Sequence, residues 1–312
     1  MKKHWNLFLP LLLFFFTMTS PSTASTSPAE QSCNMAETSL GYDDSIQEPR
    51  MFDAQKEQEG CLKIIEALTP EELSIMPDAN LPLRHFRADK GNTTKAIKRI
   101  KYALQWRKEF GVQHILKSAT NPETEEEKAT YAILKKESSP GKMYVRNHDK
   151  EGRAILYMYP VRENSNNHND NIKHLVYSLE RVIACTEKNK KEKIAMVMDF
   201  TNWSMRHNPP MKTTKETIHI LQECYVERLE RVYITNAPLL FRTFWNMVKP
   251  FIDPVTKQKI VFASGAAGME QLKLHLDEKL VEKEAGGVSD LKPFDVDEYY
   301  DTPFDQTFDE MN

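Results

Sequence analysis

The sequence predicts an α/β protein in which a helical N-terminal module precedes a mainly parallel sheet covered by helices. Residues 55–138 carry apolar side chains at helical spacing. From about residue 143, short continuous apolar strands alternate with helical segments, which is typical of a parallel sheet buried on both faces. The chain has 312 residues, of which 40% are hydrophobic and 28% charged, so it can bury a sizeable core.

Two helix starts are legible in the first half of the chain. Residues 69–72 (TPEE) form a capping box with proline at the first helical position. Asn92 opens a second, strongly amphipathic helix, in which Ile97, Ile100 and Leu104 recur on one face. Gly111 supplies the expected end of that helix.

The second half predicts four strands and the helices between them. The strands are expected at residues 153–160, 194–200, 231–235 and 260–263. A helix is expected around residues 172–183, and a capping box at residues 213–216 (TTKE) is expected to open the next one.

The ends of the chain differ in composition from the rest. Residues 1–24 combine a basic start, an apolar run and small residues, which is typical of a signal peptide; the alternative is a later start at Met35 or Met51. Residues 25–54 are expected to be a disordered linker. Residues 291–312 carry seven acids against Lys292 and are expected to be a solvated acidic tail.

Charge and cysteine usage exclude several classes of protein. Lys and Arg total 42 and Asp and Glu total 45, so the net charge of −3 argues against a strongly basic nucleic-acid binder. The four cysteines lack a C-x-x-C motif and are too sparse for a disulfide scaffold. We expect Cys185 and Cys224, which lie on apolar helical patterns, to be small buried residues.

The common catalytic motifs are absent from the sequence. It contains no G-x-G-x-x-G after a strand, no P-loop, no G-x-S-x-G and no H-E-x-x-H. The segment 264–268 (SGAAG) follows a strand, and a plain strand-to-helix turn explains it. We therefore expect no enzymatic activity, no metal and no cofactor.

Residues 239–251 (LLFRTFWNMVKPF) are apolar over more than one helical face. The segment is either a buried helix or a helix that covers an apolar cavity or meets a membrane. Directly after it, Thr256 and Lys259 offer a hydroxyl and an ammonium that would suit a phosphate. Taken alone, the pair is a weak signal, and a solvated turn explains it better.

In these residues the chain resembles the CRAL-TRIO family, and within it the phosphatidylinositol-transfer branch typified by the fungal secretory protein. The resemblance covers roughly residues 60–287. It rests on LRHFRA at 83–88, WRKEFG at 106–111, DKEGR at 149–153, MD at 198–199, ITNAP at 234–238, KPFIDPVT at 249–256 and GG at 286–287. The resemblance implies a CRAL-TRIO N-terminal module at residues 55–138 and a lipid-binding domain at residues 139–290.

The resemblance also implies lipid binding and intermembrane transfer, with phosphatidylinositol as the leading ligand. It places headgroup contacts at Lys90, Thr256 and Lys259, with Glu227 as the acidic partner of Lys259. It assigns residues 239–251 to a mobile gating helix, whose apolar residues are Phe241, Phe244, Trp245, Met247, Val248 and Phe251. An adaptable apolar cavity wall is expected from Met143, Met158, Ile194, Met196 and Met198.

The sequence departs from the family pattern at three places. Asp89 stands where the family has an arginine that contacts phosphate. Ile194 and Met196 replace hydroxyl residues that contact choline, and Ala285 replaces an aromatic residue. Two alternatives therefore stay open: a carrier of a sterol, tocopherol or retinoid, and a hydrolase using Ser264 or a non-binding adaptor.

The expected partners are membrane lipids and, transiently, a membrane surface, without nucleic acid and with the chain as a monomer. If the signal peptide is real, the protein enters the secretory route and reaches the ER lumen or the extracellular space. Otherwise it is expected in the cytoplasm, peripheral to membranes.

Overall fold

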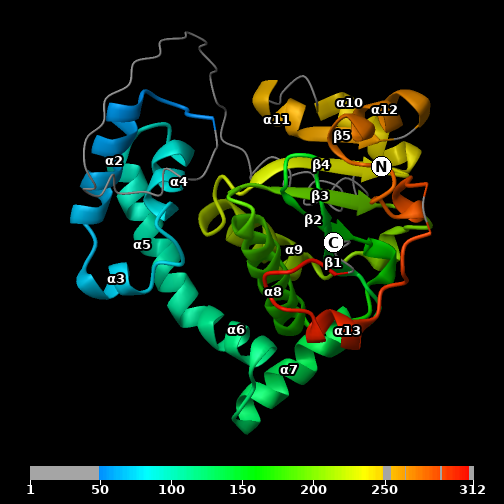
Figure 1. Cartoon of the computed structure of the whole chain (residues 1–312), viewed down its shortest axis with the longest axis horizontal. Helices are drawn as coiled ribbons and strands as arrows, with labels where there is room; N and C mark the ends of the chain where they lie inside the picture. The colour runs from blue at the N-terminus through cyan, green and yellow to red at the C-terminus, as the bar shows by residue number, and fades with distance from the viewer. Residues whose placement is uncertain (1–48, 249–253, 264, 289, 309–312) are drawn as a thin grey trace.

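The computed structural model describes residues 49–248, 254–263, 265–288 and 290–308. Five strands form one sheet in chain order: β1 (Met143–His148), β2 (Ala154–Met158), β3 (Ile194–Asp199), β4 (Leu229–Thr235) and β5 (Ile260–Ala263). β1 runs antiparallel to β2, and the other neighbours are parallel. In Figure 1 the strands lie one below another from β5 to β1. The predicted α/β fold with a helical N-terminal region is confirmed.

The helical module precedes the sheet and has a small core of its own. Its helices are α2 (Ala54–Glu66), α3 (Pro70–Ser74), α4 (Leu81–Ala88), α5 (Thr93–Phe110), α6 (Val112–Thr120) and α7 (Glu125–Ser138). The predicted capping box at Thr69 is present, and the side chain of Asn92 caps α5 by accepting from the backbone N–H of Lys95 at 3.0 Å. Gly111 ends α5 at φ 75°, in the left-handed region that glycine adopts without strain.

The remaining helices cover the sheet. They are α8 (His168–Lys188), α9 (Met211–Glu223), α10 (Leu239–Val248), α11 (Pro254–Lys259), α12 (Gly265–His275) and α13 (Val296–Asp301), with short 3-10 turns η1 (Pro160–Arg162), η2 (Met205–His207) and η4 (Lys283–Ala285). The capping box predicted at residues 213–216 is wrong, because α9 already begins at Met211. Thr213 lies inside the helix, and its hydroxyl lies 3.1 Å from Nδ1 of His168 on α8.

Buried ion pairs join the helical module to the domain that carries the sheet. Figure 1 shows helices α2–α5 of the module to the left of the sheet. Three arginines cross the contact: Arg84 to Glu192 at 2.5 Å, Arg107 to Glu180 at 2.6 Å and Arg228 to Asp78 at 2.9 Å. Burial makes each pair sensitive to loss of either partner, so the charges fix the position of the module.

Residues 290–308 form a C-terminal strap that packs along β1 rather than the solvated tail expected from the sequence. Tyr299 and Phe308 are fully buried, and the N–H of Phe308 donates to the carbonyl of Val145 on β1 at 2.9 Å. The buried guanidinium of Arg181 on α8 donates to the carbonyl of Tyr299 at 2.8 Å. Four of the acids, Asp295, Asp297, Asp301 and Asp305, do remain exposed. The strap therefore covers the free edge of the sheet, which would otherwise offer unpaired backbone groups.

Candidate functional site

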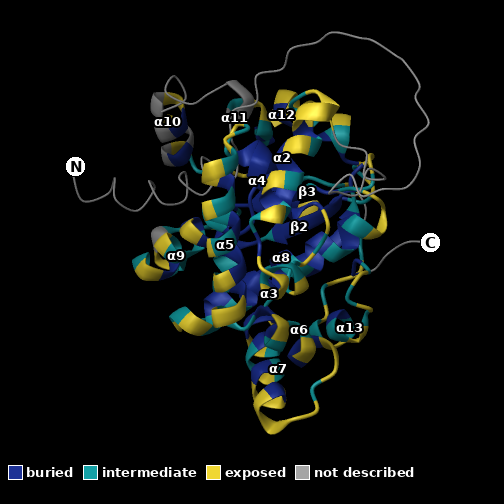
Figure 2. Cartoon of the chain, turned by 90° about the vertical axis from the view of Figure 1, so that its left-hand side faces the viewer, coloured by how far each residue is buried: buried dark blue, intermediate teal, exposed yellow. Residues whose placement is uncertain are grey.

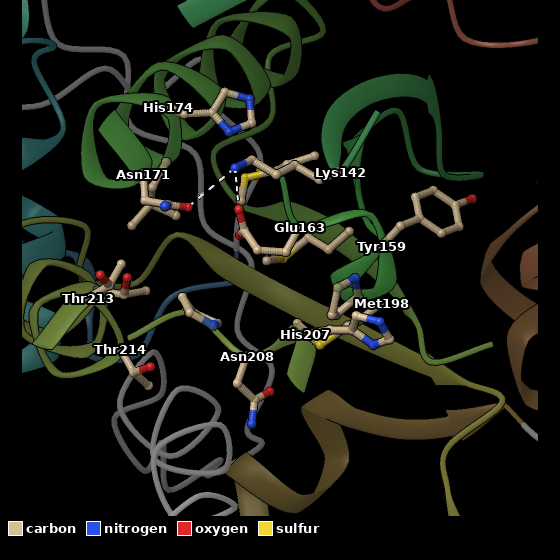
Figure 3. Close-up of a pocket in the computed structure, with 16 residues that line it drawn as sticks. Lys142, Tyr159, Glu163, Asn171, His174, Met198, His207, Asn208, Thr213 and Thr214 are labelled. Atoms are coloured by element: carbon tan, nitrogen blue, oxygen red, sulfur yellow. Dashed lines mark hydrogen bonds and ion pairs between the residues drawn. The ribbon is translucent and has the colours of Figure 1, made fainter. Parts of the chain in front are cut away.

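A cavity of about 130 Å³ lies at the carboxyl ends of β2 and β3, between α8 and α9 (Figure 3). This is the edge of a parallel sheet at which α/β proteins bind their ligands. Its apolar wall includes Met143, Met158, Leu175 and Met198. The three methionines give the wall long, unbranched side chains that adapt to the shape of a ligand.

The cavity and helix α10 lie on the same face of the sheet. Met198 lines the cavity and pairs with Ile234 on β4, which in turn pairs with Phe262 on β5. Residues paired across neighbouring strands point to the same face. Phe262 contacts Phe241 and Trp245 of α10, with ring centroids 5.9 and 5.4 Å apart. One continuous apolar floor therefore extends from the cavity to α10.

Helix α10 presents a buried and an exposed side. Phe241 and Trp245 are 0% and 5% exposed, whereas Leu239 at the start of the helix is 79% exposed. The side chains of Phe244, Met247 and Val248, and the whole of Phe251, lie outside the described residues. The described half of the helix thus packs on the sheet through two aromatic anchors, and Figure 2 shows it on the same side of the molecule as α9.

The other end of the cavity is polar. Lys142 is buried there, and its ammonium donates to Oε1 of Glu163 at 2.7 Å, to Oδ1 of Asn171 at 3.3 Å and to Glu137. Figure 3 shows His174 of α8 beside this ammonium. The cavity is therefore amphipathic, with a charged but internally paired cluster at one end.

His174 lines the cavity and is almost fully buried, at 1% exposure. Burial, and then the positive charge of Lys142, lower the pKa of His174 well below its ordinary value. The ring is therefore neutral at physiological pH. Its Nε2 atom is buried and has no hydrogen-bond partner among the described residues.

The residues predicted for the cavity wall divide into two groups. Met143, Met158 and Met198 line the cavity. Ile194 and Met196 are 0% and 1% exposed and belong to the core beneath it. In β3, Ile194, Met196 and Met198 alternate with residues of the opposite face, so all three point to the cavity side but only the last reaches the cavity.

Two of the residues predicted for the headgroup, Glu227 and Lys259, lie at the opposite end of the sheet from the cavity. Glu227 stands two residues before β4, and Lys259 is the last residue of α11, directly before β5. Both therefore lie at amino ends of strands, whereas the cavity lies at carboxyl ends. A strand of six residues such as β3 separates the two ends by roughly 20 Å.

Lys90 and Glu227 share an unusual backbone conformation. Their φ angles are 54° and 56°, in the left-handed region that residues other than glycine rarely adopt. Lys90 is exposed, whereas Glu227 is 8% exposed and its Oε1 has no hydrogen-bond partner among the described residues. Thr256 lies within α11, but its side chain is outside the described residues.

Asp89, the acid at a position where the family has arginine, forms an ion pair within the protein. Its carboxylate pairs with Arg99 of α5 at 3.3 Å, and Arg99 also pairs with Glu223 of α9 at 3.2 Å. Burial raises the pKa of Asp89, and the charge of Arg99 opposes that shift. Arg99 therefore offsets part of the negative charge that Asp89 and Glu223 bring to this region.

Comparison with known proteins agrees with the fold of this domain. The family model described as the CRAL/TRIO domain matches residues 138–287. Residues 138–287 are a CRAL/TRIO domain. A CRAL-TRIO domain-containing protein of Schizosaccharomyces pombe is 38% identical over 180 residues, which cover 58% of this chain and 16% of that protein.

Two further relatives of the CRAL/TRIO domain carry functional names. The phosphatidylinositol transfer protein PDR17 of Saccharomyces cerevisiae is 29% identical over 67% of this chain and 57% of its own length. The SEC14 cytosolic factor of Candida glabrata is 27% identical over 76% of this chain and 84% of its own length. The chain is thus similar to fungal proteins of the phosphatidylinositol-transfer branch, while it spans only 16% of the Schizosaccharomyces pombe protein and 57% of PDR17.

Sequence reasoning missed the polar end of the CRAL/TRIO cavity. Lys142, Glu163, Asn171 and His174 come from three separate segments that only the fold brings together. One local signal was available, because Asn171 and His174 stand three residues apart and so share a face of a helix whose neighbours are apolar. In the part of the chain that the structure describes, no helix is long and apolar enough to cross a membrane, and no metal-binding cluster of His, Cys, Asp or Glu occurs.

Proposed function

We propose that this protein binds one lipid, with phosphatidylinositol as the leading ligand, and carries it between membranes. The observation that carries the proposal is the amphipathic cavity of the CRAL/TRIO domain, which continues along one sheet face to the aromatic anchors of α10. A bound lipid buries its chains against this apolar floor, which contributes about 25 cal/mol for each Å² removed from water. Few polar groups then suffice to choose the headgroup.

The size of the cavity supports a role for α10 in loading. At about 130 Å³ the cavity is similar to engineered cavities of about 150 Å³ that hold a single benzene. A diacyl lipid is much larger, so binding requires the walls to move apart. Helix α10 can act as the gate because only Phe241 and Trp245 anchor its described part to the sheet.

The headgroup site is proposed at Lys90, Glu227, Thr256 and Lys259. Left-handed backbone at Lys90 and Glu227, together with an unpaired buried oxygen of Glu227, is the kind of local strain that concentrates at binding sites. Lysine supplies positive charge for a phosphate, and a carboxylate accepts hydrogen bonds from inositol hydroxyls. With the headgroup at the amino ends of the strands, the acyl chains extend over the sheet toward the cavity.

In this proposal the protein is a carrier rather than an enzyme, because transfer breaks no bond. It acts as a monomer that touches membrane surfaces transiently and binds no nucleic acid. The relative from Candida glabrata is named a cytosolic factor. The signal peptide stays a prediction, and it lies outside the described residues; sequencing the N-terminus of protein purified from its own cells decides between a start near Ser25 and one at Met35 or Met51.

The test is transfer of labelled phosphatidylinositol between vesicles by the full chain. Replacing Thr256→Ala and Lys259→Ala together removes a hydroxyl and a charge, so we expect transfer to fall at least tenfold while the fold is kept. The control is Lys128→Ala on α7, which removes the same charge at an exposed site far from the sheet. Normal transfer by the double variant would show that the headgroup lies elsewhere.

A further inference from the structure

The chain enters α10 through a turn that a buried carboxylate holds in place. Asp199 is the last residue of β3 and is 1% exposed. Its Oδ1 accepts hydrogen bonds from the hydroxyl of Thr235 at 2.8 Å and from the side-chain amide of Asn236 at 2.6 Å. The hydroxyl and the backbone N–H of Thr201 donate two more, each at 3.2 Å. No cation pairs with Asp199 among the described residues, so these hydrogen bonds stabilise its charge.

The backbone of Asn236 is the pivot between β4 and α10. Its φ angle is 50°, in the left-handed region. Asparagine adopts this region more readily than most residues, but the conformation still costs free energy and persists only where the surroundings impose it. The two residues that follow add little freedom, because Pro238 fixes its own φ and restricts Ala237 before it. A return of Asn236 to a negative φ would therefore change the direction in which α10 leaves the sheet.

The side chain of Asn236 also ties this pivot to a segment far along the chain. Its amide donates to the backbone carbonyl of Glu284 in η4 at 2.9 Å. The segment is itself held in place, because the buried carboxylate of Glu282 accepts from the hydroxyl of Tyr144 and, at 2.6 Å, from the guanidinium of Arg146. The pivot is thus fixed on two sides, by the end of β3 and by η4, to parts of the molecule outside α10.

We propose that Asp199 is a positioning residue for lipid exchange, because it holds the amide of Asn236, and with it the left-handed pivot, in the arrangement that keeps α10 closed on the sheet. This inference rests on the proposed gating role of α10. When the amide leaves Asp199, the φ angle of Asn236 can relax, and only Phe241 and Trp245 then hold the described part of the helix. Asp199 does not line the cavity, so it acts on the rate of opening through the pivot.

The test uses the isosteric change Asn236→Asp, which replaces a hydrogen bond to Asp199 by repulsion between two carboxylates. Asn236 is exposed, and aspartate also tolerates the left-handed region, so the variant should fold. Asn202 offers a matched control. It is exposed, its φ angle is 56°, and its side chain makes no hydrogen bond in the part of the chain that the structure describes. Asn202→Asp therefore makes the same change at the same backbone conformation without removing a bond to Asp199.

Hydrogen–deuterium exchange of the full chain reports the opening of α10. We expect the amides of α10 to exchange about tenfold faster or more in Asn236→Asp, since a hydrogen bond to a charged group is lost, while β3 and β4 stay protected. Asn202→Asp should match the wild type. The double variant Asp199→Asn with Asn236→Asp restores a donor and an acceptor across the same gap and should slow exchange in α10 again.

Three results of this experiment would overturn the proposal. They are unchanged exchange in α10 of Asn236→Asp, equally faster exchange in the strands or in Asn202→Asp, and a double variant no slower than Asn236→Asp alone. The first result means that the pivot does not hold α10, the second that the change destabilises the fold in general, and the third that the pairing of residues 199 and 236 is not what matters.

Release of pyrene-labelled phosphatidylinositol from the loaded protein to phosphatidylcholine vesicles is measured on the same samples. Release should be faster in Asn236→Asp by a factor similar to that of the exchange in α10, and an unchanged release rate would overturn the role of Asp199 in lipid exchange. If α10 responds as expected but the wild type neither binds nor transfers phosphatidylinositol, the proposed function fails and the pivot stands. If the wild type transfers phosphatidylinositol but α10 and the release rate are the same in every variant, the proposed function stands and the pivot is wrong.

Discussion

Three buried arginines are paired where the helical module meets the sheet, whereas the cavity and the proposed headgroup region each keep a buried polar atom open. Arg84, Arg107 and Arg228 each reach a carboxylate across the contact. By contrast, Nε2 of His174 at the cavity and Oε1 of Glu227 near the proposed headgroup site have no partner among the described residues. An open buried atom does not by itself mark a ligand site, because Nε2 of His85 in the module also lacks a partner among the described residues. His174 differs from His85 because it lines the cavity.

The largest loss of stability is expected from removing one of the paired arginines. Arg228 is 4% exposed and donates to Asp78 at 2.9 Å, to Glu187 at 2.8 Å and to the carbonyl of Glu192 at 2.9 Å. Arg228→Ala leaves the partly buried carboxylates of Asp78 and Glu187 with one cation fewer. We expect the free energy of unfolding to fall by about 3–5 kcal/mol, measured by urea denaturation.

An exposed ion pair provides the control for Arg228→Ala. Lys108 pairs with Glu71 at 2.6 Å, but both side chains are exposed. Lys108→Ala should leave the urea midpoint unchanged within error, because water and salt screen such a pair. Similar losses in the two variants would mean that burial does not distinguish the contact between module and sheet.

The strands could be predicted from the sequence because their patterns are local. The prediction for β5 matches its observed bounds, and those for β2, β3 and β4 differ by at most two residues at each end. Strand β1 was not predicted, because Arg146 interrupts its apolar pattern. Its charge is compensated by Glu282, which pairs with it at 2.6 Å from far along the chain.

The strap and the polar end of the cavity were missed for the same physical reason. The acidic composition of residues 290–308 hid the two aromatic anchors Tyr299 and Phe308, which are fully buried. Their partners on β1 and α8 lie more than a hundred residues earlier. Periodicity reports which residues share a face, but it does not report which distant group satisfies a buried charge.

A moderate loss of stability is expected when the pH is lowered. Two buried histidines can be compared, His85 in the module and His174 at the cavity. His85 in α4 is fully buried, and its Nδ1 lies 2.9 Å from the carbonyl of Leu81. Burial, reinforced by the nearby charge of Arg84, lowers the pKa of His85 to about 3. The folded state therefore keeps His85 neutral at pH values where the unfolded chain binds a proton, below about 6.5.

This shift predicts that stability is full above pH 6.5 and falls as the pH is lowered toward 3. For one such histidine the slope is about 1.4 kcal/mol per pH unit. His85→Asn keeps a donor near the Leu81 carbonyl and should reduce the slope between pH 6 and 5 by about this amount. His174→Gln should reduce it as well, because its pKa is also lowered. Urea unfolding at several pH values gives the slopes, and unchanged slopes in both variants would mean that neither histidine is held neutral.

The last comparison concerns two methionines of β3. A substitution at Met198 should change stability least and lipid binding most clearly. Met198 lines the cavity, whereas Met196, two residues earlier on the same face, is packed in the core at 1% exposure. Met198→Phe can extend its ring into about 130 Å³ of free space, so stability should change by less than about 1 kcal/mol while lipid occupancy falls. Met196→Phe has no such space and should cost about 1–3 kcal/mol.

Native mass spectrometry reports the occupancy, and urea denaturation reports the stability. If Met198→Phe is the costlier change and keeps full lipid occupancy, the space beside Met198 is not where the lipid lies.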